Sequence, residues 1–122
     1  MSSAIESIPA SPVAPRLARK TVAEFLGSQV SRRLAEDASL LTSELVSNSV
    51  IHAGMSETDP IRLDLDLDLD RLRVTVSDAE GPFASTPTRV TGGWGLVLVE
   101  RVSDRWGVRS DPPSSVWFEL DR

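Results

Sequence analysis

Hydrophobic residues recur at helical spacing in two segments of the first half of the chain. The first segment begins at Pro15, a residue suited to the first turn of a helix, and its apolar residues are Leu17, Val22, Phe25, Leu26 and Val30. The second runs from about Leu34 to Ala53, where Gly54 can end it, and its apolar residues are Leu34, Ala38, Leu41, Leu45, Val46, Val50 and Ile51. The spacing predicts two amphipathic helices.

After Pro60 the spacing of apolar residues changes to two. Residues 61–69 alternate between apolar and polar, and residues 72–78 alternate with the opposite parity. This predicts a hairpin of half-buried strands, with a turn around Asp70 and Arg71 that pairs Leu67 with Val74 and Asp68 with Arg73. We expect the aspartates at 64, 66, 68 and 70 to form a solvated face that protects a sheet edge and binds no metal.

The remaining segments complete a single domain. Residues 1–13 read as a flexible tail or an edge strand around Ile5–Ile8, and residues 79–93 as a loop rich in Gly, Pro, Ser and Thr. A helix is expected from near Trp94, followed by strands over about 105–109 and 115–120. The order predicts that residues 14–122 form one α+β domain, a two-layer α/β sandwich whose mostly antiparallel sheet carries helices on one face.

Composition excludes several functional classes. The chain has 122 residues, a net charge of -5, no cysteine and one histidine, His52, so neither a disulfide nor a zinc cluster is expected. No basic run offsets the acidic charge, which argues against nucleic acid. No apolar run reaches the ~20 residues of a membrane span, and the first 16 residues lack a signal-peptide pattern, so we expect a cytoplasmic protein without a membrane partner.

Lysine usage narrows the nucleotide-binding classes. The only lysine is Lys20, far from any glycine cluster. Walker-type nucleotide-binding proteins and ordinary protein kinases both place a lysine on the phosphates. A nucleotide site in this chain must use another arrangement.

Glu44, Asn48 and His52 follow one another at steps of four on the second predicted helix, and so share one face. A carboxylate and a carboxamide one turn apart supply oxygen ligands for Mg²⁺, or a base that holds a hydroxyl. A solvated helix edge explains the same spacing, and the spacing alone leaves both interpretations open.

Two further clusters follow. Asp78 ends a predicted buried strand, with Gly81 close behind it, and can accept a hydrogen bond from a ligand amine; an ordinary strand-to-loop exit is the alternative. Gly92, Gly93 and Gly95 adjoin the start of the third helix, where exposed N–H groups and the helix dipole favour an anion. Glycine-rich loops of this size are common, so this cluster alone is not decisive.

The order of the three clusters resembles the N, G1 and G2 boxes of the GHKL ATPases, over about Leu34 to Val108. The segment from Glu44 to Gly54, ELVSNSVIHAG, is especially similar to the N box of the bacterial anti-sigma-factor serine kinases, and Gly93-Trp-Gly-Leu is similar to their G2 region. Two departures stand out: Glu80 occupies the place of the first glycine of the second box, and the lid, 82–91, is short and lacks lysine.

The resemblance implies a Bergerat-type ATP-binding fold with ATP and Mg²⁺ as cofactors. It implies that Asn48 ligates Mg²⁺, that Asp78 accepts from the adenine amino group, and that Glu44 orients or deprotonates the substrate hydroxyl. Gly93 and Gly95 would admit the phosphates. The remaining residues that the resemblance places at the nucleotide are His52, Gly81 and Leu96.

The function implied is that of an anti-sigma factor with serine/threonine kinase activity. Its partners would be a sigma factor and an anti-sigma-factor antagonist protein, with a homodimer as an option. The altered second box favours an alternative, a non-catalytic ATP/ADP-binding switch module that binds a protein partner. A nucleotide-free interaction domain and a hydrolase using His52 are further alternatives, the last without the Gly-x-Ser-x-Gly elbow that it needs.

Overall fold

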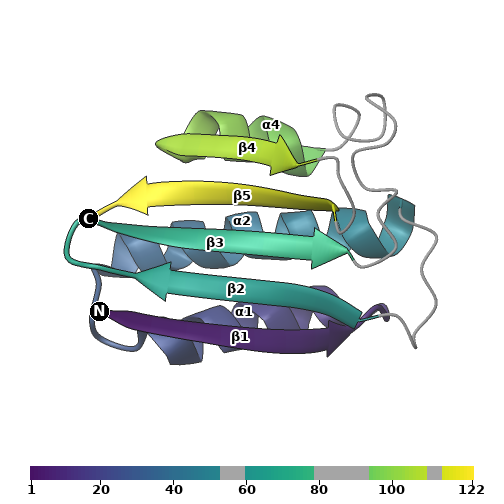
Figure 1. Cartoon of the computed structure of the whole chain (residues 1–122), viewed down its shortest axis with the longest axis horizontal. Helices are drawn as coiled ribbons and strands as arrows, with labels where there is room; N and C mark the ends of the chain where they lie inside the picture. The colour runs from purple at the N-terminus through teal and green to yellow at the C-terminus, as the bar shows by residue number, and fades with distance from the viewer. Residues whose placement is uncertain (53–59, 79–93, 110–113) are drawn as a thin grey trace.

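The computed structural model describes residues 1–52, 60–78, 94–109 and 114–122. Its elements along the chain are β1 (Ser2–Pro9), α1 (Ala14–Leu26), α2 (Arg32–His52), β2 (Pro60–Leu67), β3 (Arg71–Asp78), α4 (Trp94–Val102), β4 (Arg105–Arg109) and β5 (Ser114–Asp121). The described strands form one sheet in the order β1-β2-β3-β5-β4, and every neighbouring pair is antiparallel (Figure 1).

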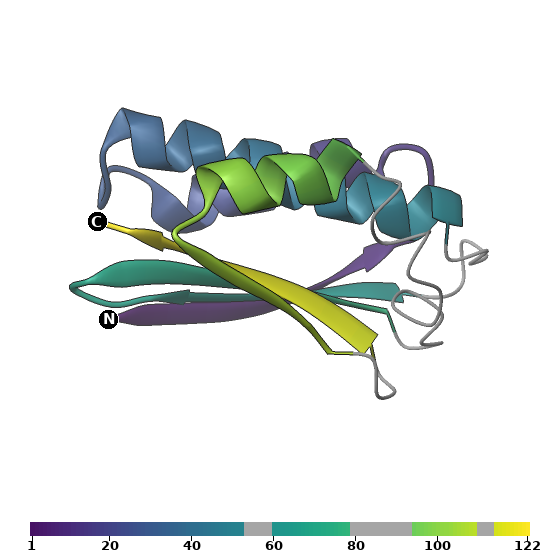
Figure 2. The same ribbon diagram turned by 90° about the horizontal axis from the view of Figure 1, so that it is seen from above.

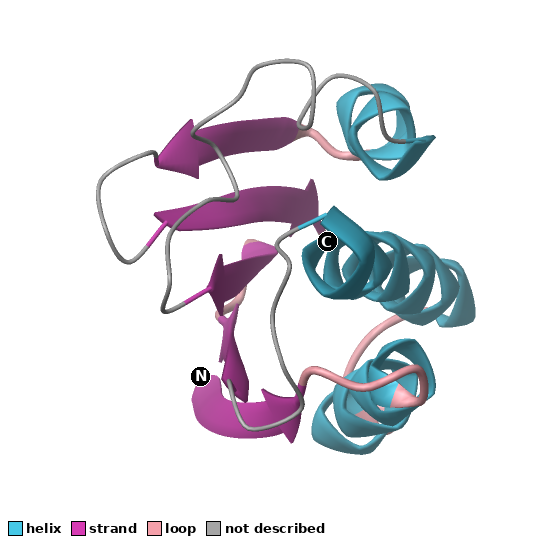
Figure 3. Ribbon diagram, turned by 90° about the vertical axis from the view of Figure 1, so that its right-hand side faces the viewer, coloured by secondary structure: helices cyan, strands magenta, loops and turns pink. Residues whose placement is uncertain are grey.

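The three described helices lie on one face of this sheet, and no described helix covers the other face (Figures 2 and 3). Alternate strand residues fill the space between the layers, since successive side chains of a strand point to opposite faces. The fully buried side chains include Phe118, Leu63, Val74 and Val76 from the sheet and Val22, Leu26, Leu41 and Leu45 from the helices. The predicted two-layer α/β sandwich is confirmed.

The β2–β3 hairpin has a different register from the one predicted. Leu67 pairs with Leu72, Leu65 with Val74 and Asp66 with Arg73, so the turn lies one residue earlier than expected. The cause is the Asp68 side chain, whose Oδ1 accepts from the backbone N–H groups of Asp70 and Arg71, each at 2.8 Å. These hydrogen bonds lower the pKa of Asp68, the bond from Asp70 first.

The strand β1 changes the interpretation of the aspartate face. Residues 2–9 pair along the whole length of β2, from Ser2 opposite Leu67 to Pro9 opposite Pro60. The prediction that the aspartates of β2 protect a sheet edge is therefore wrong, because β2 lies between β1 and β3. The aspartate row is on the sheet face that no described helix covers.

Local signals set the helix boundaries. α1 ends before Gly27, which has φ +52°, a conformation that side chains with a Cβ rarely adopt, and whose N–H donates to Ala23 O at 2.9 Å. α2 begins two residues before the predicted start, because the Ser31 hydroxyl accepts from the N–H of Leu34 at 3.2 Å and caps the helix. None of the described helices is long and apolar enough to cross a membrane.

Candidate functional site

Three elements that carry the predicted site residues meet at one end of the molecule. The C-terminal end of α2, the C-terminal end of β3 and the N-terminal end of α4 all lie at the right-hand end in Figure 1, and the perpendicular view agrees (Figure 2). The chain termini lie at the opposite end. Segments distant in sequence are therefore brought together here by the antiparallel topology.

The helix α2 supplies Glu44 and Asn48. Both side chains are half-buried, between the buried stripe of Leu41 and Leu45 and the solvent. One helical turn along the same face separates them, an axial rise of about 6 Å. His52 is the last residue of α2, and its side chain lies outside what the structure describes. The face thus holds a carboxylate and a carboxamide near its solvent boundary, as the spacing predicted.

Asp78 is the last residue of β3 and pairs with Ile61 of β2 and Ser114 of β5. Its position has the parity of Val74 and Val76, whose side chains face the helices, while its own side chain lies outside the described part. The end of β3 therefore places position 78 on the sheet face that packs against the helices.

Ser114, which the residue patterns did not single out, lies opposite Asp78 in the sheet. It is fully buried, and its hydroxyl has no hydrogen-bond partner among the described residues. Ser49, directly after Asn48 on α2, has a buried hydroxyl in the same condition. Buried hydroxyls are normally paired, so two orphans at this end of the fold favour a polar ligand or ordered water. A small polar residue at an inward strand position was the only signal that the sequence offered.

The N-terminal end of α4 carries part of the third cluster that the sequence predicted. Gly95 and Leu96 lie in its first turn, and the helix is anchored by Val99, which is buried, together with Leu98 and Val102. An N-terminal helix end carries unpaired N–H groups and a partial positive charge, which suit a phosphate. Gly81 and Gly93 lie outside the described residues.

The described donors fit a nucleotide-bound Mg²⁺ better than a cage made by the protein alone. Within residues 1–52, 60–78, 94–109 and 114–122, no three His, Cys, Asp or Glu side chains lie close enough to hold a metal ion. Protein-bound Mg²⁺ usually keeps several waters and takes one or two protein ligands beside the phosphates. Asn48 is the half-buried carboxamide that α2 offers at this end of the sheet.

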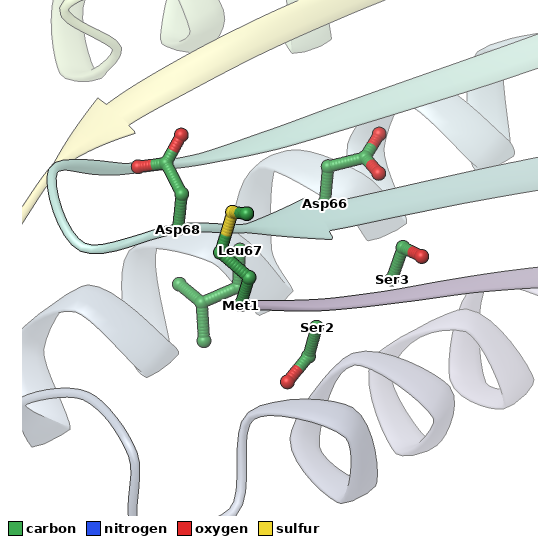
Figure 4. A pocket seen from close by; sticks show the side chains of 6 residues that line it. All are labelled: Met1, Ser2, Ser3, Asp66, Leu67 and Asp68. Atoms are coloured by element: carbon green, nitrogen blue, oxygen red, sulfur yellow. The ribbon is translucent and has the colours of Figure 1, made fainter.

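A hollow at the opposite end of the sheet does not belong to this cluster. Its volume is about 390 Å³, and its lining is Met1, Ser2, Ser3, Asp66, Leu67 and Asp68 (Figure 4). The carboxylate of Asp68 already accepts from the hairpin turn. The predicted site residues that the structure describes lie at the other end of the molecule, where α2 and β3 end and α4 begins (Figure 1).

The chain matches a known protein family over most of its length. Residues 8–118 match the family model of the histidine kinase-like ATPase domain. A search of curated protein sequences gave no significant match.

A solved structure with the same fold is described as the RsbU and RsbW domains of Rv1364c from Mycobacterium tuberculosis. The TM-score is 0.77 over 98% of this chain, at 18% sequence identity, and the chain spans 32% of that protein's length. At this identity the likeness concerns the fold. Because the family model covers residues 8–118, most of the chain, the chain belongs to the histidine kinase-like ATPase domain family.

Proposed function

We propose that this chain binds ATP with Mg²⁺ at the end of the sheet where α2, β3 and α4 meet, and that it acts as an anti-sigma factor with serine/threonine kinase activity. Its substrate would be an anti-sigma-factor antagonist, and its second partner a sigma factor in the cytoplasm. Family membership supports the ATP-binding part. The observation that supports the site is the pairing of Asp78 with Ser114, a buried serine whose hydroxyl has no hydrogen-bond partner among the described residues.

Each residue would have a separate task. Asn48 would ligate Mg²⁺ through its amide oxygen, with His52, Gly81 and Leu96 lining the nucleotide. Asp78 would accept from the adenine amino group. Ser114 would bond the base directly or through one water, because its hydroxyl is buried beside that strand position. The backbone at Gly93 and Gly95 would lie against the phosphates at the start of α4.

ATP would supply the transferred phosphoryl group, and Glu44 would act on the acceptor. A half-buried carboxylate one turn from the metal ligand can orient a serine or threonine hydroxyl and take its proton. Asn48, by contrast, carries no proton-accepting group at neutral pH. The two residues should therefore separate binding from transfer.

The experiment compares variants of these two residues. Asn48→Ala should abolish the rise in melting temperature caused by Mg-ATP, while Asn48→Asp, which keeps an oxygen ligand, should retain part of it. Glu44→Ala should leave ATP binding within a few-fold and reduce transfer to an antagonist protein by roughly 10²–10⁴. Glu36→Ala is the matched control, since it removes a carboxylate of α2 that is paired only with exposed Arg32.

A second function rests on one sequence feature. Glu80 stands where the resemblance expects a glycine, which favours an ATP/ADP-binding switch without transfer. Labelled ATP with candidate antagonists distinguishes the two: nucleotide binding without any phosphorylated product supports the switch. Equal stability changes in Asn48→Ala and Glu44→Ala, with nucleotide binding unaffected by either, would contradict both functions. Sedimentation of the whole chain tests the homodimer.

A further inference from the structure

A row of hydroxyl and guanidinium side chains crosses the sheet on the face without described helices. Strand pairing places its members directly beside one another, one from each strand, in the order Ser7, Arg62, Ser77, Ser115 and Arg109. None of the five is acidic, although the chain as a whole has a net charge of -5. The row is therefore a local concentration of hydrogen-bond donors and positive charge.

These side chains line a hollow of about 440 Å³, together with Pro60, Asp64 and Thr75. That volume lies within the usual range for small-molecule sites. Ser115 is only 8% exposed, so the floor of the hollow is shielded from solvent by its neighbours. In the register of the sheet, Arg62 and Arg109 flank Ser77 and Ser115 from the two neighbouring strands.

The two arginines differ in their present partners. Arg62 is held by Asp64 of the same strand, with Nε 3.0 Å from Oδ2 and one terminal nitrogen 3.0 Å from Oδ1. Arg109 forms no ion pair with any described residue. Asp64 thus partly neutralises one side of the hollow, while no described carboxylate pairs with the arginine on the other side.

We propose that this row binds the phosphate group of a small phosphate monoester, with Arg62 and Arg109 on either side and the hydroxyls of Ser77 and Ser115 below. Arginine forks match phosphate oxygens, and serine hydroxyls donate to them. A polyanion is disfavoured, because Asp64 also lines the hollow. This site is separate from the proposed nucleotide site and does not depend on it, since Ser77 and Ser115 point to the opposite face of the sheet from Val76 and Val116.

The test titrates the full chain with inorganic phosphate and, separately, with glycerol 3-phosphate, while amide shifts of Ser77, Ser115 and Arg109 are followed by NMR. Saturable shifts at these residues with both ligands, tighter for the monoester, are expected. Arg109→Ala should weaken binding by about ten-fold or more, the loss of one charge-assisted contact. The phosphate affinity of Arg109→Lys should lie between those of the parent and Arg109→Ala, because lysine keeps the positive charge but cannot form the two parallel hydrogen bonds of a guanidinium.

Asp64→Asn is expected to change the phosphate affinity in the opposite direction to Arg109→Ala. It should tighten phosphate binding several-fold by freeing Arg62, a gain that a purely structural role of these residues would not produce. Arg16→Ala, which removes an exposed arginine from α1, is the charge-matched control and should change nothing. Shifts confined to the start of α4, or unchanged affinity in both Arg109→Ala and Asp64→Asn with the fold intact by circular dichroism, would overturn the proposal.

Discussion

Gly107 of β4 lies directly opposite Trp117 of β5, and the indole ring occupies the space into which any side chain at 107 would project. A Cβ added at Gly107 would come within 2.7 Å of Trp117 Nε1 and 2.8 Å of two ring carbons. On the β3 side, the Arg73 guanidinium lies over the same ring, 4.1 Å from its centroid. A shift of the ring away from a side chain at 107 would therefore disturb its contact with Arg73.

We expect Gly107→Ala to destabilise the fold by about 1–3 kcal/mol, the usual cost of overpacking. Urea unfolding followed by circular dichroism measures it. Gly107→Ala combined with Trp117→Val should cost less than the sum of the two single changes, because the smaller side chain removes the clash. Unchanged stability in Gly107→Ala would mean that the ring moves aside freely.

The carboxylate of Glu119 gives the fold an acid-sensitive contact. It is only 7% exposed and receives hydrogen bonds from Arg105 Nε at 2.7 Å and from Arg73 at 3.2 Å. The bond from Arg105 is the main cause that lowers the pKa of Glu119 below its ordinary value of 4.5, while burial acts in the opposite direction. Because the folded-state pKa is the lower one, the stabilisation is complete above about pH 4.5 and is lost as the pH falls through the folded-state value.

Glu119→Gln should therefore be less stable than the parent at pH 7, and the difference should shrink as the pH falls below about 4.5. Urea midpoints at a series of pH values provide the comparison. Glu36→Gln, at an exposed pair on α2, serves as the control and should leave the pH profile unchanged. Parallel profiles for Glu119→Gln and the parent would contradict the assignment.

Asp78→Asn tests the adenine contact. An amide can turn a donor toward the base where an acceptor is needed, so the variant should lose preference for ATP over GTP. Competition of the two nucleotides in a thermal-shift assay measures the preference. If the variant discriminates as strongly as the parent, Asp78 does not read the adenine amino group.

Ser114→Ala should separate stability from binding. Replacing a buried, unpaired hydroxyl by a methyl group removes a desolvation cost, so the chain without nucleotide should be as stable as the parent or more stable. ADP affinity should nevertheless fall, because the hydroxyl is lost beside Asp78. Calorimetry of ADP binding and a urea curve on the same sample show both effects. Lower stability together with unchanged affinity would assign the hydroxyl to the fold alone.

Much of the fold could be predicted from residue spacing. The alternation from Ile61 to Val76 indicated both strands of the hairpin and their buried sides, because one face of the sheet packs on helices. The register was missed, since it depends on Asp68 bonding two backbone N–H groups of its own turn. Alternation fixes the parity of a strand, and both registers keep that parity.

The candidate site was predictable to a lesser degree. The spacing of Glu44 and Asn48 predicted that they share a face of α2 near the solvent boundary, whereas their roles stay a prediction. Ser114 could not be found, because its relation to Asp78 arises from pairing between strands that are distant in sequence. The same holds for Glu119, whose two arginines come from different strands. Pairwise register is the information that a single sequence lacks.

The position of β1 has a consequence for how the chain is made. Among the described strands its only partner is β2, and both α1 and α2 are synthesised between them. Ribosomes add about 5–20 residues per second, so the first strand waits for several seconds before its partner exists. The β2–β3 hairpin closes locally within about 1–10 μs, whereas β1 must close a long loop. We therefore expect β1 to dock onto a hairpin that is already formed.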